Sequence, residues 1–204
     1  MSKVLIIKSS AAGQGSVSNQ LIDQFRNSYA AGHLDATFTE HDLGRHPLPP
    51  LSALNLAGFA GTAAESADEV ALAQTSETLV SELEAADIVV IGAPMYNFGV
   101  TALLKTWFDY VLRAGRTFRY TETGPVGLLT GKKAIVIESR GGLYSEGPAA
   151  VMDSQEPHIR TMLGFVGITD VTFVRAEKLA FGPDARDAAI AAAGNDLGQL
   201  AAAA

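Results

Sequence analysis

The chain has 204 residues, 48% of them hydrophobic, which is enough for one compact domain that spans residues 1–204. Its net charge of −7 disfavours nucleic acid or an anionic membrane as a partner, because both require a basic face. The lack of cysteine excludes disulfides and thiolate metal sites, and the lack of a signal peptide or an apolar run of membrane-spanning length predicts a cytoplasmic protein.

Short apolar runs alternate with helical patterns along the chain. Most of the runs are continuously apolar, rich in β-branched residues and bounded by Gly, Pro, Asp or Ser, as is typical of strands buried on both faces of a parallel sheet. In chain order, the expected strands are residues 4–7, 36–40, 88–91, 134–137 and 171–174. The expected helices are residues 18–31, 65–85, 101–113, 148–165 and 184–202. Ser18 or Asn19 is expected to cap the first helix, and the Pro-rich residues 43–62 are interpreted as a long surface excursion.

This alternation predicts an α/β fold with a flavodoxin-like, doubly wound, five-stranded parallel sheet in the order 2-1-3-4-5 and helices on both faces. Sheets of this kind bind ligands at the carboxyl ends of their strands, next to the point where the strand order reverses. Functional residues are therefore expected in the loops after the first, third and fourth strands, and each of these loops has an unusual composition.

The loop after the first strand, residues 9–19, is rich in serine and glycine. It begins a G-x-G pattern at Gly13 but lacks the third glycine of a dinucleotide fingerprint, and no Lys-Ser or Lys-Thr closes a Walker A loop. Its hydroxyl groups, together with the N-terminus of the following helix, suit a single phosphate. An ordinary strand-to-helix turn with a helix cap explains the same residues equally well.

The loops after the third and fourth strands contain groups that suit a flat ring. Met95 and Phe98 offer apolar contact and Asn97 offers an amide, although such side chains also plug the end of a sheet. Gly141 and Gly142 let backbone N–H groups approach a ligand, although an ordinary Gly-rich turn without a ligand explains the two glycines as well. Together, a phosphate cradle and a ring platform indicate a mononucleotide with a large heterocycle, and FMN fits better than a dinucleotide.

At these loops the sequence resembles the FMN-dependent NADH-azoreductases, a branch of the flavodoxin-like quinone reductases. The resemblance runs from Met1 to about Pro183, and its most specific pieces are Lys8-Ser9-Ser10 and residues 93–98, 114–120, 124–128 and 139–142. It implies that the FMN phosphate is held by Ser10, Ser16, Val17 and Ser18. It implies that the isoalloxazine ring is flanked by Met95, Tyr96, Asn97, Phe98, Ser139, Arg140, Gly141 and Gly142. The implied substrate pocket includes Tyr120 and Met162.

The resemblance further implies an enzyme with tightly bound FMN and with NADH or NADPH as its electron donor. Its chemistry would be ping-pong: hydride passes from the donor to flavin N5, and the flavin then reduces quinones by two electrons or cleaves azo bonds to amines. Members of this family are homodimers whose active sites lie at the subunit interface. No side chain is required as a catalytic acid, so none is assigned.

Two other classes of function stay open from the residues alone. A flavodoxin-like electron carrier would bind FMN without reacting with NAD(P)H itself, and a binding module would bind no flavin. Glu138, at a strand end, is either close to the flavin or part of an ion pair. His41 and His46 have neither metal-ligand spacing nor a carboxylate partner in the pattern, so no metal site is expected, and His158 is expected in a loop or at a pocket rim.

Overall fold

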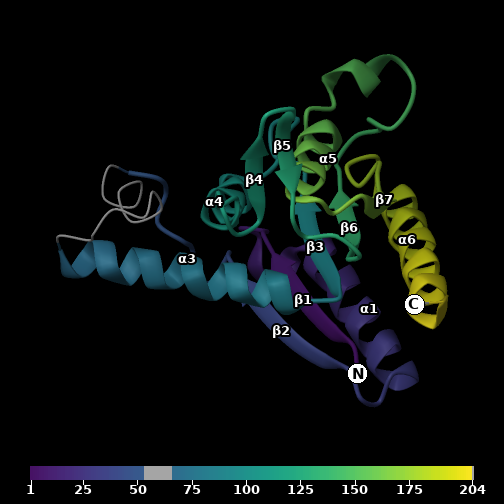
Figure 1. Cartoon of the computed structure of the whole chain (residues 1–204). Coiled ribbons are helices and arrows are strands. Elements are labelled where there is room, and N and C mark those ends of the chain that lie inside the picture. Colours follow the sequence, from purple (N-terminus) through teal and green to yellow (C-terminus); the bar gives the residue numbers. More distant parts are fainter. Residues whose placement is uncertain (53–65, 204) are drawn as a thin grey trace.

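The computed structural model describes residues 1–52 and 66–203 and has one central parallel sheet (Figure 1). The strands of this sheet are β1 (Lys3–Lys8), β2 (Thr37–Asp42), β3 (Ile88–Pro94), β6 (Lys133–Ser139) and β7 (Asp170–Ala176). They lie in the order β2-β1-β3-β6-β7, so the predicted order 2-1-3-4-5 is confirmed. Every neighbouring pair is parallel, and the carboxyl ends of all the strands therefore meet at one edge of the sheet.

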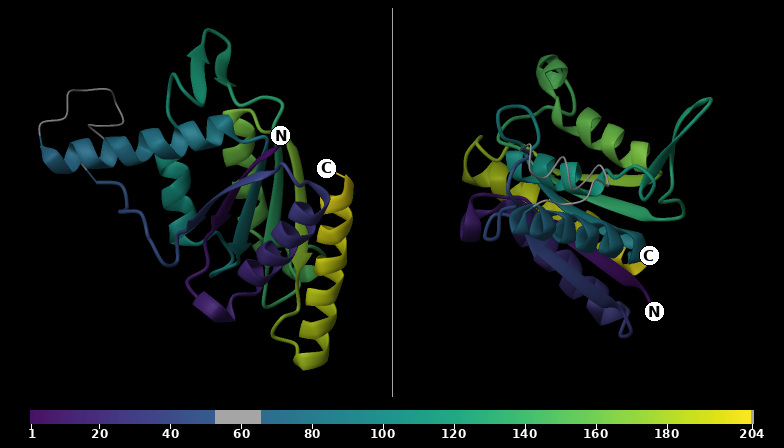
Figure 2. Two further views of the ribbon diagram at one scale, coloured as in Figure 1. Left: turned by 90° about the horizontal axis from the view of Figure 1, so that it is seen from below. Right: turned by 60° about the vertical axis from the view of Figure 1, so that its left-hand side comes forward.

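Helices cover both faces of the sheet, and Figure 2 shows the two layers. One layer consists of α1 (Val17–Gly32) and α6 (Pro183–Ala203), and the other of α3 (Ala67–Ala85), α4 (Ala102–Val111) and α5 (Gln155–Val166). Each face has its own hydrophobic core, and successive side chains of β1 enter opposite cores: Val4 packs with the α1 layer and Leu5 with the α3 layer. This burial on two sides is the reason why the strands read as continuous apolar runs.

Most helices begin within two residues of the predicted start, but the N-cap of α1 and the start of α5 differ from the prediction. The N-cap of α1 is Ser16, whose Oγ accepts a hydrogen bond from Asn19 N at 3.1 Å, so the prediction of Ser18 or Asn19 as the cap is wrong. The expected helix over 148–165 is divided into a 3-10 helix, η2 (Pro148–Met152), and α5. The division falls at Asp153, whose Oδ1 accepts hydrogen bonds from the first two amides of α5.

A β-hairpin that the sequence did not predict follows α4. Its strands are β4 (Phe118–Thr121) and β5 (Gly124–Gly127), and it projects from the body of the protein in both views of Figure 2. The base of the hairpin crosses the end of α5 so closely that a Cβ on Gly127 would lie 2.2 Å from Gly167 N.

No helix of the described residues is long and apolar enough to cross a membrane. Residues 53–62 of the expected surface excursion lie outside the described residues.

Candidate functional site

The loop after β1 surrounds a small cavity at the carboxyl edge of the sheet. The cavity has a volume of about 160 Å³ and is lined by Ser10, Ala12, Gly15, Ser16, Val17, Pro94, Met95, Tyr96, Ser139 and Leu179. Its lining comes mainly from the carboxyl ends of β1, β3 and β6 and the residues that follow them, and Leu179 adds a contact from the segment after β7. The loop after β1 leads into α1, and the amides of a helix's first turn have no intrahelical partner. These amides and the neighbouring hydroxyls form a neutral, donor-rich cradle, and donors of this kind could hold an anion.

The serines expected at the cradle have different positions. Ser10 and Ser16 line the cavity, whereas Ser18 is fully buried, and its Oγ lies 3.2 Å from Ser16 Oγ. The hydroxyl of Tyr96 accepts a hydrogen bond from Ala11 N at 3.2 Å and lies 3.5 Å from Ser10 Oγ. Tyr96 thus connects the loop after β3 to the loop after β1, a role that its sequence position alone does not reveal.

Two further residues hold the first loop in place: Ser9, which belongs to the predicted loop, and Gly44, which the sequence did not indicate as part of the site. Ser9 is buried, and its Oγ donates a hydrogen bond to Gly92 O at 2.6 Å, which joins the ends of β1 and β3. Gly44, in the turn after β2, packs so closely that a Cβ there would lie 2.1 Å from Ser10 O. The backbone of the cradle is therefore fixed from two neighbouring strands.

The loop after β3 is a tight turn with a strained backbone. The amide and carbonyl of Tyr96 pair with those of Gly99 at 3.1 Å, and the two residues between them, Asn97 and Phe98, have φ values of 49° and 70°. Positive φ is common for Asn but unfavourable for Phe, and such strain persists only where neighbouring structure imposes it. Phe98 O accepts a hydrogen bond from Ser154 N at 2.9 Å, so part of that restraint comes from the segment before α5.

The loop after β6 presents two open backbone donors. The carbonyls of Gly141 and Gly142 accept hydrogen bonds from Ala180 N and Lys178 N at 3.0 and 2.9 Å. Within the described residues, the N–H groups of these two glycines donate to no acceptor. The loop is thus anchored through its carbonyls, and its amides remain available to a ligand.

Arg140 turns its side chain into the protein, away from solvent. The residue is completely buried, and its guanidinium contacts Glu138 at 2.7 Å, Asp153 at 3.0 Å and Glu177 at 3.2 Å. The structure therefore shows Glu138 in an ion pair, the second of the two alternatives for this carboxylate. Burial raises the pKa of Glu138 to about 7, although the positive charge of Arg140 opposes this shift.

Neither of the expected substrate-pocket residues lines the cavity between the three loops. Tyr120 lies on β4, is 74% exposed, and packs its ring against Phe118 with the centroids 5.5 Å apart. Met162 lies on α5 and packs, partly buried, against the core on that face of the sheet.

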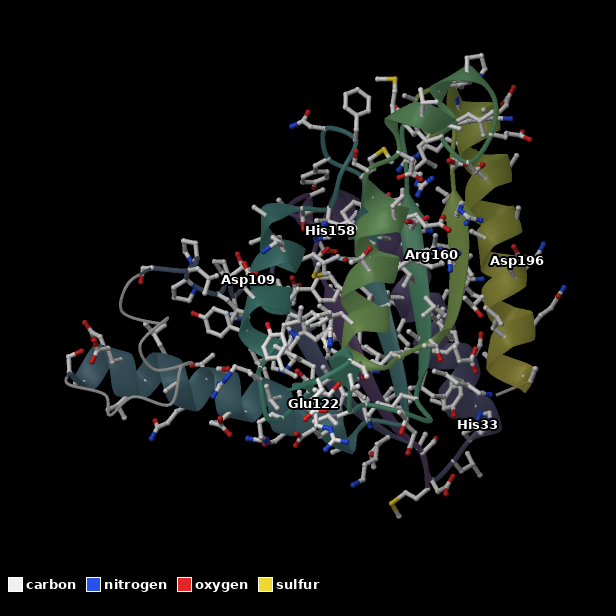
Figure 3. The ribbon with its side chains drawn as sticks, turned by 45° about the horizontal axis from the view of Figure 1, so that its top comes forward. His33, Asp109, Glu122, His158, Arg160 and Asp196 are labelled. Carbon is white, nitrogen blue, oxygen red and sulfur yellow. The ribbon has the colours of Figure 1, made fainter. Side chains whose placement is uncertain are left out.

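The histidines differ from what the sequence suggests. His41 Nε2 lies 2.5 Å from Glu82 Oε2, so the expectation that His41 has no carboxylate partner is wrong. His158 is in α5 rather than in a loop, and its Nε2 is buried without a partner among the described residues. His158 lies on the side of α5 that faces α4, and Arg160 lies on the opposite side, where its guanidinium stacks 4.3 Å from the ring centroid of Phe173 (Figure 3).

The parallel sheet and the loops at its carboxyl edge are those of a known class of α/β proteins. The chain belongs to the family described as having a flavodoxin-like fold, whose match spans residues 2–201. Relatives named FMN-dependent NADH:quinone oxidoreductase are 53% identical to it in Hyphomonas neptunium, over 98% of this chain and 96% of the relative, and 51% identical in Ralstonia nicotianae, over 94% and 93%.

Solved structures point to the same group of proteins. The azoreductase of Bacillus anthracis strain Sterne is 33% identical, with a TM-score of 0.91 and full coverage of both chains. An FMN-dependent NADH-azoreductase of Bacillus anthracis strain Ames Ancestor, solved in complex with FMN, is 26% identical, with a TM-score of 0.88 over 98% of this chain. The resemblance inferred from the motifs is confirmed.

Proposed function

We propose that this chain is an FMN-dependent NADH:quinone oxidoreductase that also cleaves aromatic azo compounds. The observation that carries the proposal is the convergence of the carboxyl ends of β1, β3 and β6 on one cavity at a helix N-terminus. The open amides of Gly141 and Gly142 follow shortly after Ser139, the residue of β6 that lines this cavity. The names of the relatives and of the solved neighbours support FMN as cofactor and NADH as donor. We propose further that the whole chain, residues 1–204, forms one domain, and that it works in the cytoplasm.

The residues of the site fit FMN at both of its ends. Ser10, Ser16 and Val17 would hold the phosphate, with Ser18 supporting Ser16 from behind. The isoalloxazine would lie between two ring-binding segments, one with Met95, Tyr96, Asn97 and Phe98, the other with Ser139, Arg140, Gly141 and Gly142. The open amides of the second segment would stabilise negative charge on the ring, a role that needs well-placed donors and no catalytic acid.

When bound, FMN supplies the redox chemistry: it takes hydride from NADH or NADPH and passes two electrons to a quinone, or four electrons in two such rounds to an azo bond, which yields two amines. The protein binds and orients the reactants. We propose a ping-pong order, because donor and acceptor would use the same open space over the ring.

We propose that the protein is a homodimer with its active sites at the subunit interface. The hairpin carries exposed apolar side chains, Tyr120 at 74%, Val126 at 40% and Leu128 at 37%, which a second subunit would cover. In that arrangement Tyr120 and Met162 would help to form the substrate pocket.

Purified protein tests the function directly. We expect a yellow protein that NADH alone bleaches, and parallel double-reciprocal plots in steady-state kinetics with NADH and NADPH against a benzoquinone and a simple azo dye. A yellow protein that NADH leaves oxidised would indicate an electron carrier. A colourless protein that takes up no FMN would refute the proposal.

Replacing Ser10, Ser16 and Ser18 together with alanine tests the cradle. Hydrogen bonds to a charged group contribute about 1.5–3 kcal/mol each, so we expect FMN affinity to fall more than a hundredfold while the protein stays folded. Ser28→Ala, an exposed serine later in α1, is the matched control. Unchanged FMN affinity in the triple variant would contradict the assignment of the cradle.

A further inference from the structure

Two buried side chains connect the carboxyl ends of β3 and β6. Arg140 and Gln155 are both fully buried. The side-chain amide of Gln155 accepts a hydrogen bond from Arg140 Nε at 3.0 Å and donates one from Nε2 to Ala93 O at 2.7 Å. Ala93 comes just before Met95 in the first ring-binding segment, and Arg140 comes just before Gly141 in the second. One carboxamide therefore adds a side-chain link between two segments that are also joined by the backbone hydrogen bond from Met95 N to Ser139 O at 2.9 Å.

The same guanidinium also holds the segment that precedes α5. It contacts three carboxylates within 3.2 Å, those of Glu138, Asp153 and Glu177, so its positive charge is more than balanced. Taking such a group of charges out of water is costly, and a well-packed apolar cluster of similar volume is often equally stable or more stable. Stability of the fold alone is therefore a poor explanation for this arrangement, whereas a fixed position for the loops is a good one.

The bridge reaches the strained turn through a second set of contacts. Glu177 Oε1 accepts hydrogen bonds from the amides of Tyr144 and Ser145 at 2.9 and 3.0 Å. The ring of Tyr144 meets that of Phe98 edge to face, with centroids 6.0 Å apart, and Ser154 N donates to Phe98 O at 2.9 Å. Residues on both sides of the proposed ring site are thus connected to the guanidinium of Arg140.

We propose that Arg140 and Gln155 are positioning residues that reinforce the backbone link between the two ring-binding segments and so control the affinity and reduction potential of FMN without touching the flavin through their side chains. The inference rests on the proposed function. Reduced FMN carries more negative charge than oxidised FMN, so it gains more from donors that are held in place, such as the amides of Gly141 and Gly142. Loosening the bridge weakens binding of the reduced form most, and the potential becomes more negative.

Two substitutions test the bridge. Gln155→Leu removes both hydrogen bonds at nearly constant volume, and Arg140→Lys keeps the charge but removes the Nε donor. Each variant should raise the dissociation constant of FMN about tenfold. If the affinity for reduced FMN falls by a further factor of ten relative to oxidised FMN, the two-electron reduction potential falls by about 30 mV. Because both changes break one bridge, the double variant should resemble a single variant instead of showing a hundredfold loss.

The control and a second readout separate positioning from simple stability. Arg116→Lys alters another arginine that bridges two carboxylates, Glu77 and Glu84, far from the ring-binding segments in the sequence, and should leave FMN binding and potential unchanged. In the apoprotein, amide hydrogen exchange of residues 93–99 and 139–147 should rise together in both bridge variants. If Gln155→Leu does not fold, Arg140→Lys decides.

The outcomes separate this inference from the function on which it rests. Wild-type protein that binds no FMN refutes the proposed function and the bridge with it. If the wild type binds FMN, and the variants keep its affinity and potential even with lowered thermal stability, only the bridge is refuted. Strictly additive losses in the double variant also overturn it, because the two residues would then act independently.

Discussion

We expect Gly44→Ala to weaken FMN binding, although Gly44 does not line the cavity of the cradle. Its Cβ would lie 2.1 Å from Ser10 O, whereas ordinary contacts begin at 3.4 Å, so the two backbones must separate by more than 1 Å. The turn that carries Gly44 cannot retreat easily, because Asp42 Oδ1 accepts hydrogen bonds from Gly44 N and Arg45 N at 3.0 and 3.1 Å. The loop with Ser10 is therefore the part that moves.

The size of the effect follows from this geometry. Forcing one additional methyl group into a packed site costs about 1–3 kcal/mol. If the apoprotein relieves that strain by moving Ser10, FMN binding must restore it, and the dissociation constant rises about 5- to 150-fold. Titration of apoprotein with FMN, followed by quenching of flavin fluorescence, measures the change. Gly32→Ala, at the far end of α1 with open space around its Cβ, is the control. Wild-type affinity in the Gly44 variant would show that the loop absorbs the methyl group elsewhere.

Two further changes test other parts of the structure. Gly127→Ala places a Cβ 2.2 Å from Gly167 N, so the hairpin should detach and trypsin should cut after Arg119 several-fold faster, with FMN still bound; an unchanged cleavage rate would contradict this. Burial raises the pKa of Glu138 to about 7, above its ordinary 4.5, so the folded state binds the proton more tightly than the unfolded state. The free energy of unfolding of the wild type should therefore fall as the pH rises from about 4.5 to 7. Glu138→Gln should remove this fall in urea unfolding measured at pH 5 and 8, and an equal fall in both proteins would count against the assignment.

The fold was predictable because burial on both faces leaves a strong signal in each strand. All the residues of the expected run 134–137 lie within β6, and the strand order followed from the alternation of strands and helices. The hairpin gave no such signal: three of the four residues of β4 are exposed, and it is held by the close crossing of Gly127 and Gly167. A crossing of two glycines that are distant in the sequence cannot be read from either segment alone.

The site was predictable to the extent that topology decides it. Once the sheet order was known, the strand ends that bring Ser10, Met95 and Ser139 together were known as well. Gly44 and Gln155 could not be found in this way, because their roles depend on contacts with Ser10 and Ala93, and for Gln155 that contact joins residues 62 positions apart. A glycine in a turn and a glutamine at a helix start have no motif of their own.

The cradle has no charged side chain in its lining, and this property explains why so many supporting contacts surround it. The buried cation Lys8, at the end of β1, pairs with Asp23 at 2.7 Å and with Glu40 at 2.9 Å, so its charge is already neutralised. Attraction between full charges falls slowly with distance, but a hydrogen bond from an amide or hydroxyl weakens steeply when its geometry changes. A phosphate held by neutral donors therefore depends on the position of each donor, and in this protein Ser9 and Gly44 fix those positions from the neighbouring strands.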